Sequence, residues 1–383
     1  MLRYKFLIIW LVMSCAASAQ QLTTNWTFEA GARVIGEAVL HHDNLYFGNV
    51  KGTFYSLNTN TGKINWTFET GVPIQSRPLI EGNHIYFEAG VDLYKITNSG
   101  KLIWHYASGD VPEKFSYDDK DYLYTLDSWD DKHSNPVIYN NHLIIGMASG
   151  RLVFLDKETG TPVKTIYSIT GAPIRSTPTV NDDMLYFGDW EGYVYAFDIK
   201  GWQLRWIKKT YDNATKPYPT FGGIASDFTV YEEHLYFGLR NPQLQVLDVN
   251  TGNIKWTYSD SDGGWMIGDP RVYNDTLYIA GSDNYAMFAF HPTSGRTFWK
   301  HQRKLNIYSR ALITSKYIIY TSADSYAPQK DGEIVILDRI TGKLVTSYGF
   351  AYGAFAPPLM DQQSNILFIS NRGVVHSMRF LAK

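Results

Sequence analysis

Cysteine is almost absent from this chain, and that absence removes whole classes of chemistry. The single cysteine is Cys15, which lies in a segment with the features of an export signal. We therefore expect the mature protein to have no disulfide, no cysteine nucleophile and no cysteine-ligated metal. The chain also lacks a run of basic residues, and its 35 basic and 37 acidic side chains nearly balance. Nucleic acid is therefore not an expected partner.

Long apolar runs and familiar catalytic signatures are missing as well. After residue 20 no stretch is apolar enough to span a bilayer. The sequence has no HExxH, G-x-S-x-G or phosphate-binding loop, so it offers no hydrolase or nucleotide-binding motif. The acidic stretches at residues 118–121 and 260–263 lack the spacing of a calcium loop. We interpret both as solvated loops.

The first 19 residues are predicted to be a signal peptide. Arg3 and Lys5 form a basic start, residues 6–13 are apolar, and Ala17-Ser18-Ala19 resembles a cleavage site. An alternative interpretation is a lipobox at residues 12–15, which would place a lipid anchor on Cys15. Both interpretations predict export, and they leave residues 20–383 as one folded domain.

The chain is rich in one long repeat. An apolar strand ending in glycine is followed by an aromatic-rich strand, a turn with Asp and Thr-Gly, and a strand with Trp, as in residues 45–66. The copies begin at Leu45, Ile85, Leu143, Leu185, Leu235, Leu277, Ile318 and Ile366. Four short strands in a period of roughly 40–50 residues are typical of propeller blades. The sequence therefore predicts an all-β, eight-bladed β-propeller of four-stranded antiparallel blades.

The eighth copy ends before its tryptophan strand. A matching strand sequence is found at the other end of the chain, where Asn25-Trp26-Thr27-Phe28 repeats Asn65-Trp66-Thr67-Phe68. We predict that the N-terminal strand completes blade eight and closes the ring, because closure removes open sheet edges.

The recurring tryptophans are predicted to dock each blade on its neighbour, since a large ring in an outer strand can be buried there. The docking set is Trp26, Trp66, Trp104, Trp206, Trp256 and Trp299. Lys164 and Thr346 replace tryptophan in units three and seven, where we expect weaker blade contacts. The aspartates that end each third strand, such as Asp156 and Asp248, are interpreted as turn-forming residues.

A ring of polar residues is expected where the innermost strands line the central channel. Counting back from each repeat start gives Glu37, Arg77, Asn135, Thr177, Asp227, Asp269 and Arg310, with Pro357 in blade eight. The arginines could hold carboxylates and the acids a hard cation. The favoured interpretation is a hydrated channel whose opposite charges neutralise one another, and we expect no metal site.

The S-x-P-x-V, LYFG, G-x-x-Y-A-x-D and T-G-x-x-x-W segments resemble the PQQ-type propeller repeat over residues 25–380. That family contains quinoprotein dehydrogenases and non-enzymatic envelope proteins, including a component of the outer-membrane barrel assembly machinery. The layout of one propeller with little else is similar to the second group. The dehydrogenases would imply PQQ and calcium, with Asp227 or Asp269 as the base and Asn135 as a ligand. Their vicinal cysteines are absent here, and we expect no cofactor.

Insertions between blades bring aromatic residues to one face, because all connections from a fourth strand to the next blade emerge together. Loop aromatics mark binding surfaces. The predicted partner-binding face comprises Tyr117, Tyr122, Trp129, Tyr211, Tyr218, Phe221, Trp265 and Tyr352.

These observations favour binding over catalysis. We expect an exported, monomeric, non-enzymatic scaffold in the periplasm or at the outer membrane. Its expected partner is an envelope protein, with a barrel assembly component as the family's example. Two alternatives stay open: a PQQ- and calcium-dependent dehydrogenase that uses the channel, and a carbohydrate-binding propeller in which Trp129 or Trp265 stacks on sugars.

Overall fold

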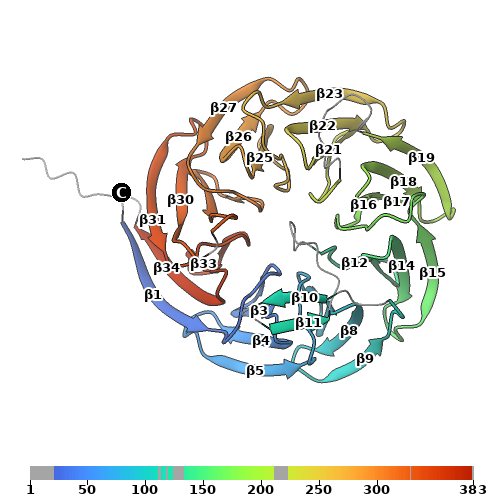
Figure 1. Cartoon of the computed structure of the whole chain (residues 1–383), viewed down its shortest axis with the longest axis horizontal. Coiled ribbons are helices and arrows are strands. Elements are labelled where there is room, and N and C mark those ends of the chain that lie inside the picture. The colour runs from blue at the N-terminus through green and yellow to red at the C-terminus, as the bar shows by residue number, and fades with distance from the viewer. Residues whose placement is uncertain are drawn as a thin grey trace, which may run out of the picture.

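Eight four-stranded antiparallel sheets are arranged as blades in a ring (Figure 1). This computed structural model describes residues 21–110, 114–117, 120–123, 133–210, 223–327 and 329–381. All the described regular structure is strand, with no helix among these residues. The predicted all-β, eight-bladed propeller is confirmed.

Each blade has strands A to D from the centre outward. Blades one to four comprise, in that order, β2 (Val39–His41), β3 (Asn44–Gly48), β4 (Thr53–Asn58) and β5 (Ile64–Glu69); β6 (Leu79–Glu81), β7 (His84–Ala89), β8 (Asp92–Thr97) and β9 (Leu102–Tyr106); β12 (Val137–Tyr139), β13 (His142–Gly146), β14 (Arg151–Asp156) and β15 (Pro162–Tyr167); and β16 (Thr179–Asn181), β17 (Met184–Gly188), β18 (Tyr193–Asp198) and β19 (Gln203–Lys209).

Blades five to eight follow the same plan. They comprise β20 (Thr229–Tyr231), β21 (His234–Gly238), β22 (Gln243–Asp248) and β23 (Ile254–Ser259); β24 (Arg271–Tyr273), β25 (Thr276–Gly281), β26 (Ala286–Phe290) and β27 (Thr297–Gln302); β28 (Leu312–Ile313), β29 (Tyr317–Ser322), β30 (Gly332–Asp338) and β31 (Leu344–Phe350); and β32 (Leu359–Met360), β33 (Asn365–Ile369), β34 (Val374–Leu381) and β1 (Gln21–Glu29).

Blade eight joins the two ends of the chain. Strand β1 pairs antiparallel with β34, from Gln21 opposite Leu381 to Glu29 opposite Val374. The predicted closure by the N-terminal strand is therefore confirmed, and the ring of sheets has no open end at blade eight (Figure 1).

The insertion after blade two contains more structure than the loop that the sequence predicts. Strands β10 (Lys114–Tyr117) and β11 (Lys120–Leu123) form a two-stranded antiparallel sheet. Among the described strands they pair only with each other, so this hairpin is an addition to the eight blades.

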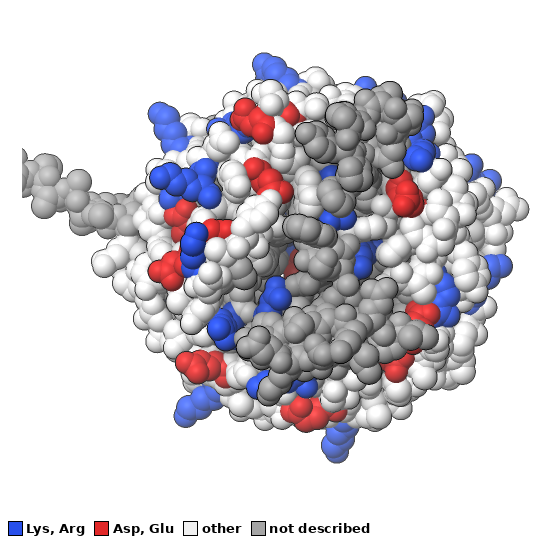
Figure 2. Space-filling view, in the orientation of Figure 1, with Lys and Arg blue, Asp and Glu red and all other residues white. Residues whose placement is uncertain are grey.

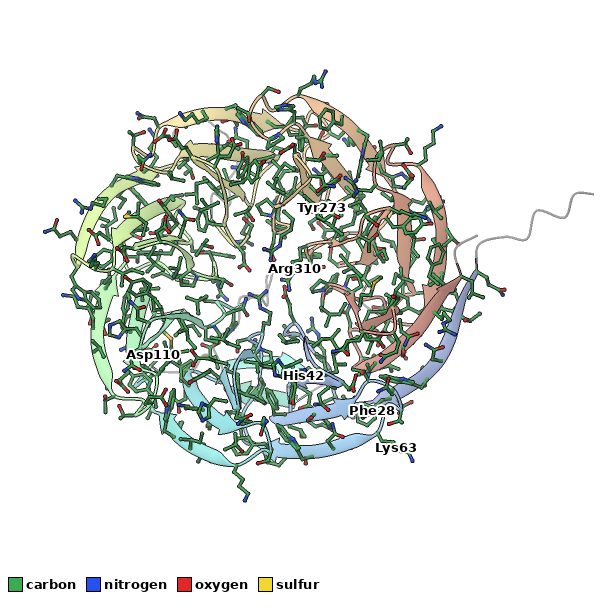
Figure 3. All side chains as sticks on the ribbon, turned by 180° about the vertical axis from the view of Figure 1, so that it is seen from behind. Phe28, His42, Lys63, Asp110, Tyr273 and Arg310 are labelled. Carbon is green, nitrogen blue, oxygen red and sulfur yellow. The ribbon has the colours of Figure 1, made fainter. Side chains whose placement is uncertain are left out.

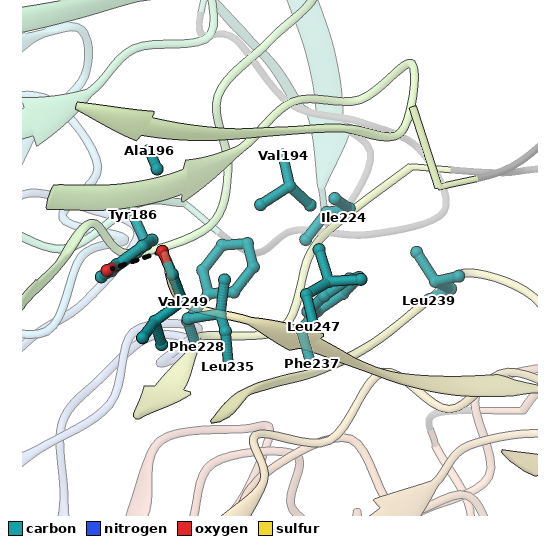
Figure 4. Packing of buried hydrophobic residues seen from close by; sticks show 10 residues of the cluster. All are labelled: Tyr186, Val194, Ala196, Ile224, Phe228, Leu235, Phe237, Leu239, Leu247 and Val249. Atoms are coloured by element: carbon teal, nitrogen blue, oxygen red, sulfur yellow. Dashed lines mark hydrogen bonds between the residues drawn. The ribbon is translucent and has the colours of Figure 1, made fainter. Parts of the chain in front are cut away.

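In the described part of the chain the hydrophobic core consists of eight clusters, which fill the spaces between neighbouring blades. Between blades four and five, Val194 packs with Leu235 and Phe237 (Figure 4). The Tyr186 hydroxyl donates to the Val249 carbonyl at 3.2 Å. Strand alternation explains this arrangement, since each sheet presents one set of side chains to each neighbouring blade.

The antiparallel order gives the ring two different faces. The turns between A and B and between C and D lie on one face, called here the turn face. The connections between B and C and between D and the next A lie on the other, called the loop face. No helix among the described residues is long and apolar enough to cross a membrane.

Candidate functional site

The ring residues occupy equivalent places in their blades. Each lies two positions before the first paired residue of its A strand, as with Glu37 before Val39 and Arg77 before Leu79. By the same register Pro357 is the blade-eight member, since Leu359 is the first paired residue there. Arg310 lies near the centre of the ring in Figure 3.

Five ring residues form a chain of hydrogen bonds from blade to blade. The Arg77 amide donates to Asn135 Oδ1 at 2.6 Å, and Asn135 Nδ2 donates to Thr177 Oγ1 at 2.7 Å. The Thr177 amide donates to Asp227 Oδ1 at 3.1 Å, and the Asp227 amide donates to Asp269 Oδ1 at 2.7 Å. These bonds satisfy buried polar groups and join blades two to six at their inner edges.

Ion pairs complete the ring through blade one. Glu37 Oε2 lies 3.1 Å from Arg77 Nη1 and 2.5 Å from Arg310 Nη1. Arg77 is also 3.9 Å from Asp227, and Arg310 is 3.8 Å from Asp269. Burial disfavours the charged form of Arg310, but Glu37, Asp269 and Asp227 outweigh it and raise its pKa. Glu37 therefore bridges two guanidinium groups.

Arg271 is a central residue that sequence reasoning missed. It begins β24, two positions after Asp269, where blades one to three have Val39, Leu79 and Val137. Burial lowers its pKa, and the positive charge of Arg310 lowers it further. The signal was present in the sequence, because only unit six has a charged residue at this position.

This donor set does not fit a calcium–quinone centre. Both amide atoms of Asn135 are engaged within the ring, and Asp227 and Asp269 each accept a backbone amide and face an arginine. In the described part of the chain no group of three or more His, Cys, Asp or Glu side chains could hold a metal. The arrangement neutralises buried charge and links blades.

The aromatic residues expected on the loop face are described only in part. Trp129, Tyr211, Tyr218 and Phe221 lie outside the described residues. Tyr117 and Tyr122 belong to β10 and β11, and their backbones pair across that hairpin with Lys120 and Phe115.

The two remaining aromatics of this set pack against arginines. The Arg240 guanidinium lies between two indoles, 4.6 Å from Trp265 and 4.1 Å from Trp190, and Arg175 lies 5.0 Å from Trp190. The Tyr352 ring lies 4.9 Å from the Arg372 guanidinium. Trp265 and Tyr352 are half-buried, so each ring combines an internal contact with an exposed portion.

Charge on this face is mixed. In Figure 2 the described surface carries acidic and basic side chains side by side, without a continuous field of one sign. Such a surface does not favour a polyanion or a polycation as the partner.

The six docking tryptophans make the same contact. Each indole nitrogen donates to a backbone carbonyl of the next blade at 2.9 to 3.2 Å. Each ring also covers a turn glycine of that blade, where an added Cβ would lie 2.5 to 2.8 Å from the indole. These glycines are Gly62, Gly100, Gly160, Gly252, Gly295 and Gly342, all with positive φ.

Blades three and seven lack the docking tryptophan, and each contacts the next blade in a different way. In blade four Trp202 projects back from the C–D turn and meets Phe154 at 5.1 Å and Lys164 at 5.4 Å. Blade eight has no C–D turn, because β34 and β1 come from opposite ends of the chain. There Tyr317 packs edge-on against Phe380 at 5.2 Å. The expectation of a weaker blade contact at Lys164 therefore did not take into account Trp202 of the neighbouring blade.

The buried pair of His133 and Glu88 was also not predicted from the sequence. His133 Nδ1 lies 2.6 Å from Glu88 Oε2, and both side chains are about 5% exposed, at 4% and 5%. Glu88 stands where the repeat has glycine, as in Gly48 and Gly146. This departure from glycine was the sequence signal that could have identified Glu88 as an unusual residue.

The fold and the ring together define an eight-bladed PQQ-type propeller whose central polar groups bond to one another. A family model described as "Outer membrane protein assembly factor BamB" matches residues 16–116, 92–223 and 191–380. The chain belongs to this family, and the predicted resemblance is confirmed.

Curated relatives with this name are distant. The protein from Francisella tularensis subsp. tularensis (strain SCHU S4) is 23% identical over 227 residues, which is 56% of this chain and 44% of the relative. The protein from Kangiella koreensis is 30% identical over 125 residues, which is 30% of each. The matched part thus spans less than half of each relative.

Solved structures show the same fold. BamB from Moraxella catarrhalis has a TM-score of 0.62 at 16% identity, covering 93% of this chain and 88% of that one. Quinohemoprotein alcohol dehydrogenase from Comamonas testosteroni has a TM-score of 0.71 at 12% identity, covering 95% and 78%. At these identities the likeness concerns architecture alone.

Proposed function

We propose that this protein is an exported, non-enzymatic scaffold that binds an envelope protein during outer-membrane protein assembly. The observation that carries this proposal is membership of the assembly-factor family. The central ring supports it physically, because its carboxylates, amide and guanidinium groups bond to one another. A dehydrogenase would need those groups for a cofactor.

The loop face is the proposed partner-binding surface. It carries the β10–β11 hairpin with Tyr117 and Tyr122, and half-buried rings at Trp265 and Tyr352. Aromatic residues supply large contact areas at low entropic cost and are enriched in protein interfaces. The hairpin pairs only with itself among the described strands, so a partner strand could add to it.

The proposed location rests on the predicted export signal at residues 1–19, or on a predicted lipid anchor at Cys15 in the alternative interpretation. Mass spectrometry of the mature N-terminus separates the two. An N-terminus at Gln20 supports a soluble periplasmic form, and a lipid-modified Cys15 supports an outer-membrane-associated form.

The functional proposal is tested by crosslinking the tagged mature protein in its own envelope, followed by affinity capture and mass spectrometry. Recovery of outer-membrane barrel assembly components is the expected result. A variant in which a Gly-Ser segment of equal length replaces residues 112–131 should lose this capture while keeping its unfolding transition.

Two outcomes would overturn the proposal. An empty capture from the wild-type envelope would argue against the scaffold. Undiminished capture by the variant would remove the hairpin from the binding surface. Specific retention on immobilised envelope polysaccharide, lost on Trp265→Ala, would instead support a carbohydrate-binding propeller.

A further inference from the structure

The B–C turn of blade six differs from those of blades one, three, four and eight at a half-buried position. Corresponding turns end in glycine at Gly52, Gly150, Gly192 and Gly373, each donating its amide three residues back. In blade six Tyr285 takes this place, with the same bond to Ser282 and a φ of 52°. A tyrosine in the left-handed region is strained, and such strain persists where a side chain is needed.

Among the described residues, Asp283 in the same turn is a carboxylate without a cationic partner. It accepts from Asn306 Nδ2 at 2.8 Å and from the Tyr326 hydroxyl at 3.1 Å. No Lys or Arg of the described residues forms an ion pair with it. Burial raises its pKa, although Tyr326 and Asn306 lower it. The ionised form thus has hydrogen-bond donors, but no opposite charge from the described part of the chain pairs with it.

Nearby acids on the loop face do have cations. Lys300 lies 3.0 Å from Asp260, and Arg303 donates to both carboxylate oxygens of Glu333. Asp324 lies 3.3 Å from Lys330. Asp283 is therefore the exception in a region where these carboxylates are neutralised.

One exposed aromatic side chain contacts this carboxylate. Tyr326 has 70% of its surface exposed, although its hydroxyl is held by Asp283. Burial of that hydroxyl raises the Tyr326 pKa to about 12, together with the charge of Asp283 and smaller contributions from Tyr308 and Tyr285. Of these three tyrosines, Tyr326 contacts Asp283 through its hydroxyl, and Tyr285 follows Asp283 by two residues in the same turn. Tyr308 packs on Phe355, with ring centroids 4.6 Å apart.

The exposed Tyr326 ring is held in place before any ligand arrives. Asn306 Oδ1 accepts from both the amide and the hydroxyl of Ser325, at 3.1 and 3.0 Å. Asp324 Oδ1 accepts from the amides of Tyr326 and Ala327, at 3.0 Å each. A ring fixed in this way loses little entropy on binding.

We propose that Asp283, Tyr285 and Tyr326 form a binding site for the guanidinium group of an arginine presented by a partner protein. A carboxylate supplies the opposite charge, and tyrosine rings attract a cation through their faces. Arginine fits better than lysine, because its planar group stacks on rings while donating to a carboxylate. The site lies on the loop face, and only its assignment to a protein partner rests on the proposed function.

The test uses N-acetyl-arginine amide as the probe and N-acetyl-citrulline amide as its uncharged isostere. Tyrosine resonances of the 13C-tyrosine-labelled mature protein are followed by NMR and assigned with Tyr285→Phe and Tyr326→Phe. We expect saturable shifts at Tyr285 and Tyr326 with the arginine probe alone. Asp283→Asn should weaken binding roughly tenfold.

Asp331→Asn is the matched control, since Asp331 is an exposed acid of the adjacent blade-seven connection and should bind as the wild type does. Tyr326→Leu is the second variant, and urea unfolding verifies that each variant is folded. Equal shifts with arginine and citrulline amides, no shift at all, or undiminished binding by Asp283→Asn would each overturn the site. Wild-type capture of assembly components alongside a failed probe titration would reject this site and leave the proposed function standing.

Discussion

The indole of Trp202 in blade four takes the place that Lys164 leaves open in blade three, with the Lys164 ammonium 5.4 Å from the ring. In six other interfaces the tryptophan comes from the preceding blade and lies on a glycine of the next. Here the direction is reversed, and Phe154 fills the place opposite Lys164. An indole thus packs between these two blades as well, although it comes from the following blade, which is consistent with close packing.

Truncation of Trp202, which docks on the preceding blade instead of the next, should therefore destabilise the propeller. Trp202→Ala removes a half-buried ring and leaves a cavity, which we expect to lower the free energy of unfolding by about 3 kcal/mol. Lys164→Ala should cost less than about 1 kcal/mol, because it removes one partly exposed contact. Equilibrium urea unfolding measures both, and equal losses would contradict the reversed docking.

Glu37 is predicted to be the key carboxylate of the central ring. Glu37→Gln leaves the two guanidinium groups of Arg77 and Arg310 facing each other across a neutral amide. We expect a loss of about 2 kcal/mol in unfolding free energy. Glu191→Gln, at an exposed acid, is the control and should change stability by less than about 0.5 kcal/mol. A stability equal to that of the control would show that the ring charges do not depend on Glu37.

His376 should make stability depend on pH. It stacks on Phe368 at 4.7 Å and lies 5.6 Å from Phe350, and burial lowers its pKa to about 4. The unfolded state, with a pKa near 6.5, binds a proton first as the pH falls. Stability is therefore complete above pH ~6.5 and declines toward pH ~4, by roughly 2 kcal/mol after allowance for partial exposure.

His376→Phe should remove this part of the decline, as measured by urea midpoints between pH 7 and about 4. Asp248 contributes in a lower window, because bonding to Lys255 lowers its pKa to about 2. Its contribution is lost only as the pH falls below ~4. An unchanged slope in the His376→Phe variant would contradict the assignment.

Tyr285 should matter for binding more than for folding. Tyr285→Asn keeps a residue that tolerates the left-handed conformation and removes the ring. We expect the unfolding free energy to stay within about 1 kcal/mol of the wild type, since relieved strain offsets lost packing. Affinity for N-acetyl-arginine amide should fall about threefold to tenfold. A large destabilisation with unchanged affinity would make Tyr285 a packing residue instead.

Local patterns were sufficient to predict the architecture. Strand alternation around Tyr193 and Tyr195, the turn aspartates and the recurrence from Leu45 to Ile366 all repeat with the blade. The Asn-Trp-Thr-Phe sequence that occurs at both Trp26 and Trp66 was enough to place β1 in blade eight. Such signals can be recognised because every blade repeats the same strands and turns in the same order.

The contacts that depart from the repeat could not be predicted in this way. Trp202 resembles an ordinary turn residue until blade three is placed beside it, and Arg271 reaches the centre only through the register of β24. Asp283 and Tyr326 are 43 residues apart, and no pattern within one unit links them. Their meeting depends on how two adjacent blades pack.

The sequence by itself thus determined the class, the number of blades, the closing strand and the residues that stand at the ring position. These follow from periodic hydrophobicity and turn chemistry, which act over a few residues. Tertiary structure alone decided which ring side chains bond to one another, which cation each carboxylate receives, and that Asp283 receives none from the described residues. Those outcomes depend on distances between separate blades, and electrostatic and packing energies are set by such distances rather than by order along the chain.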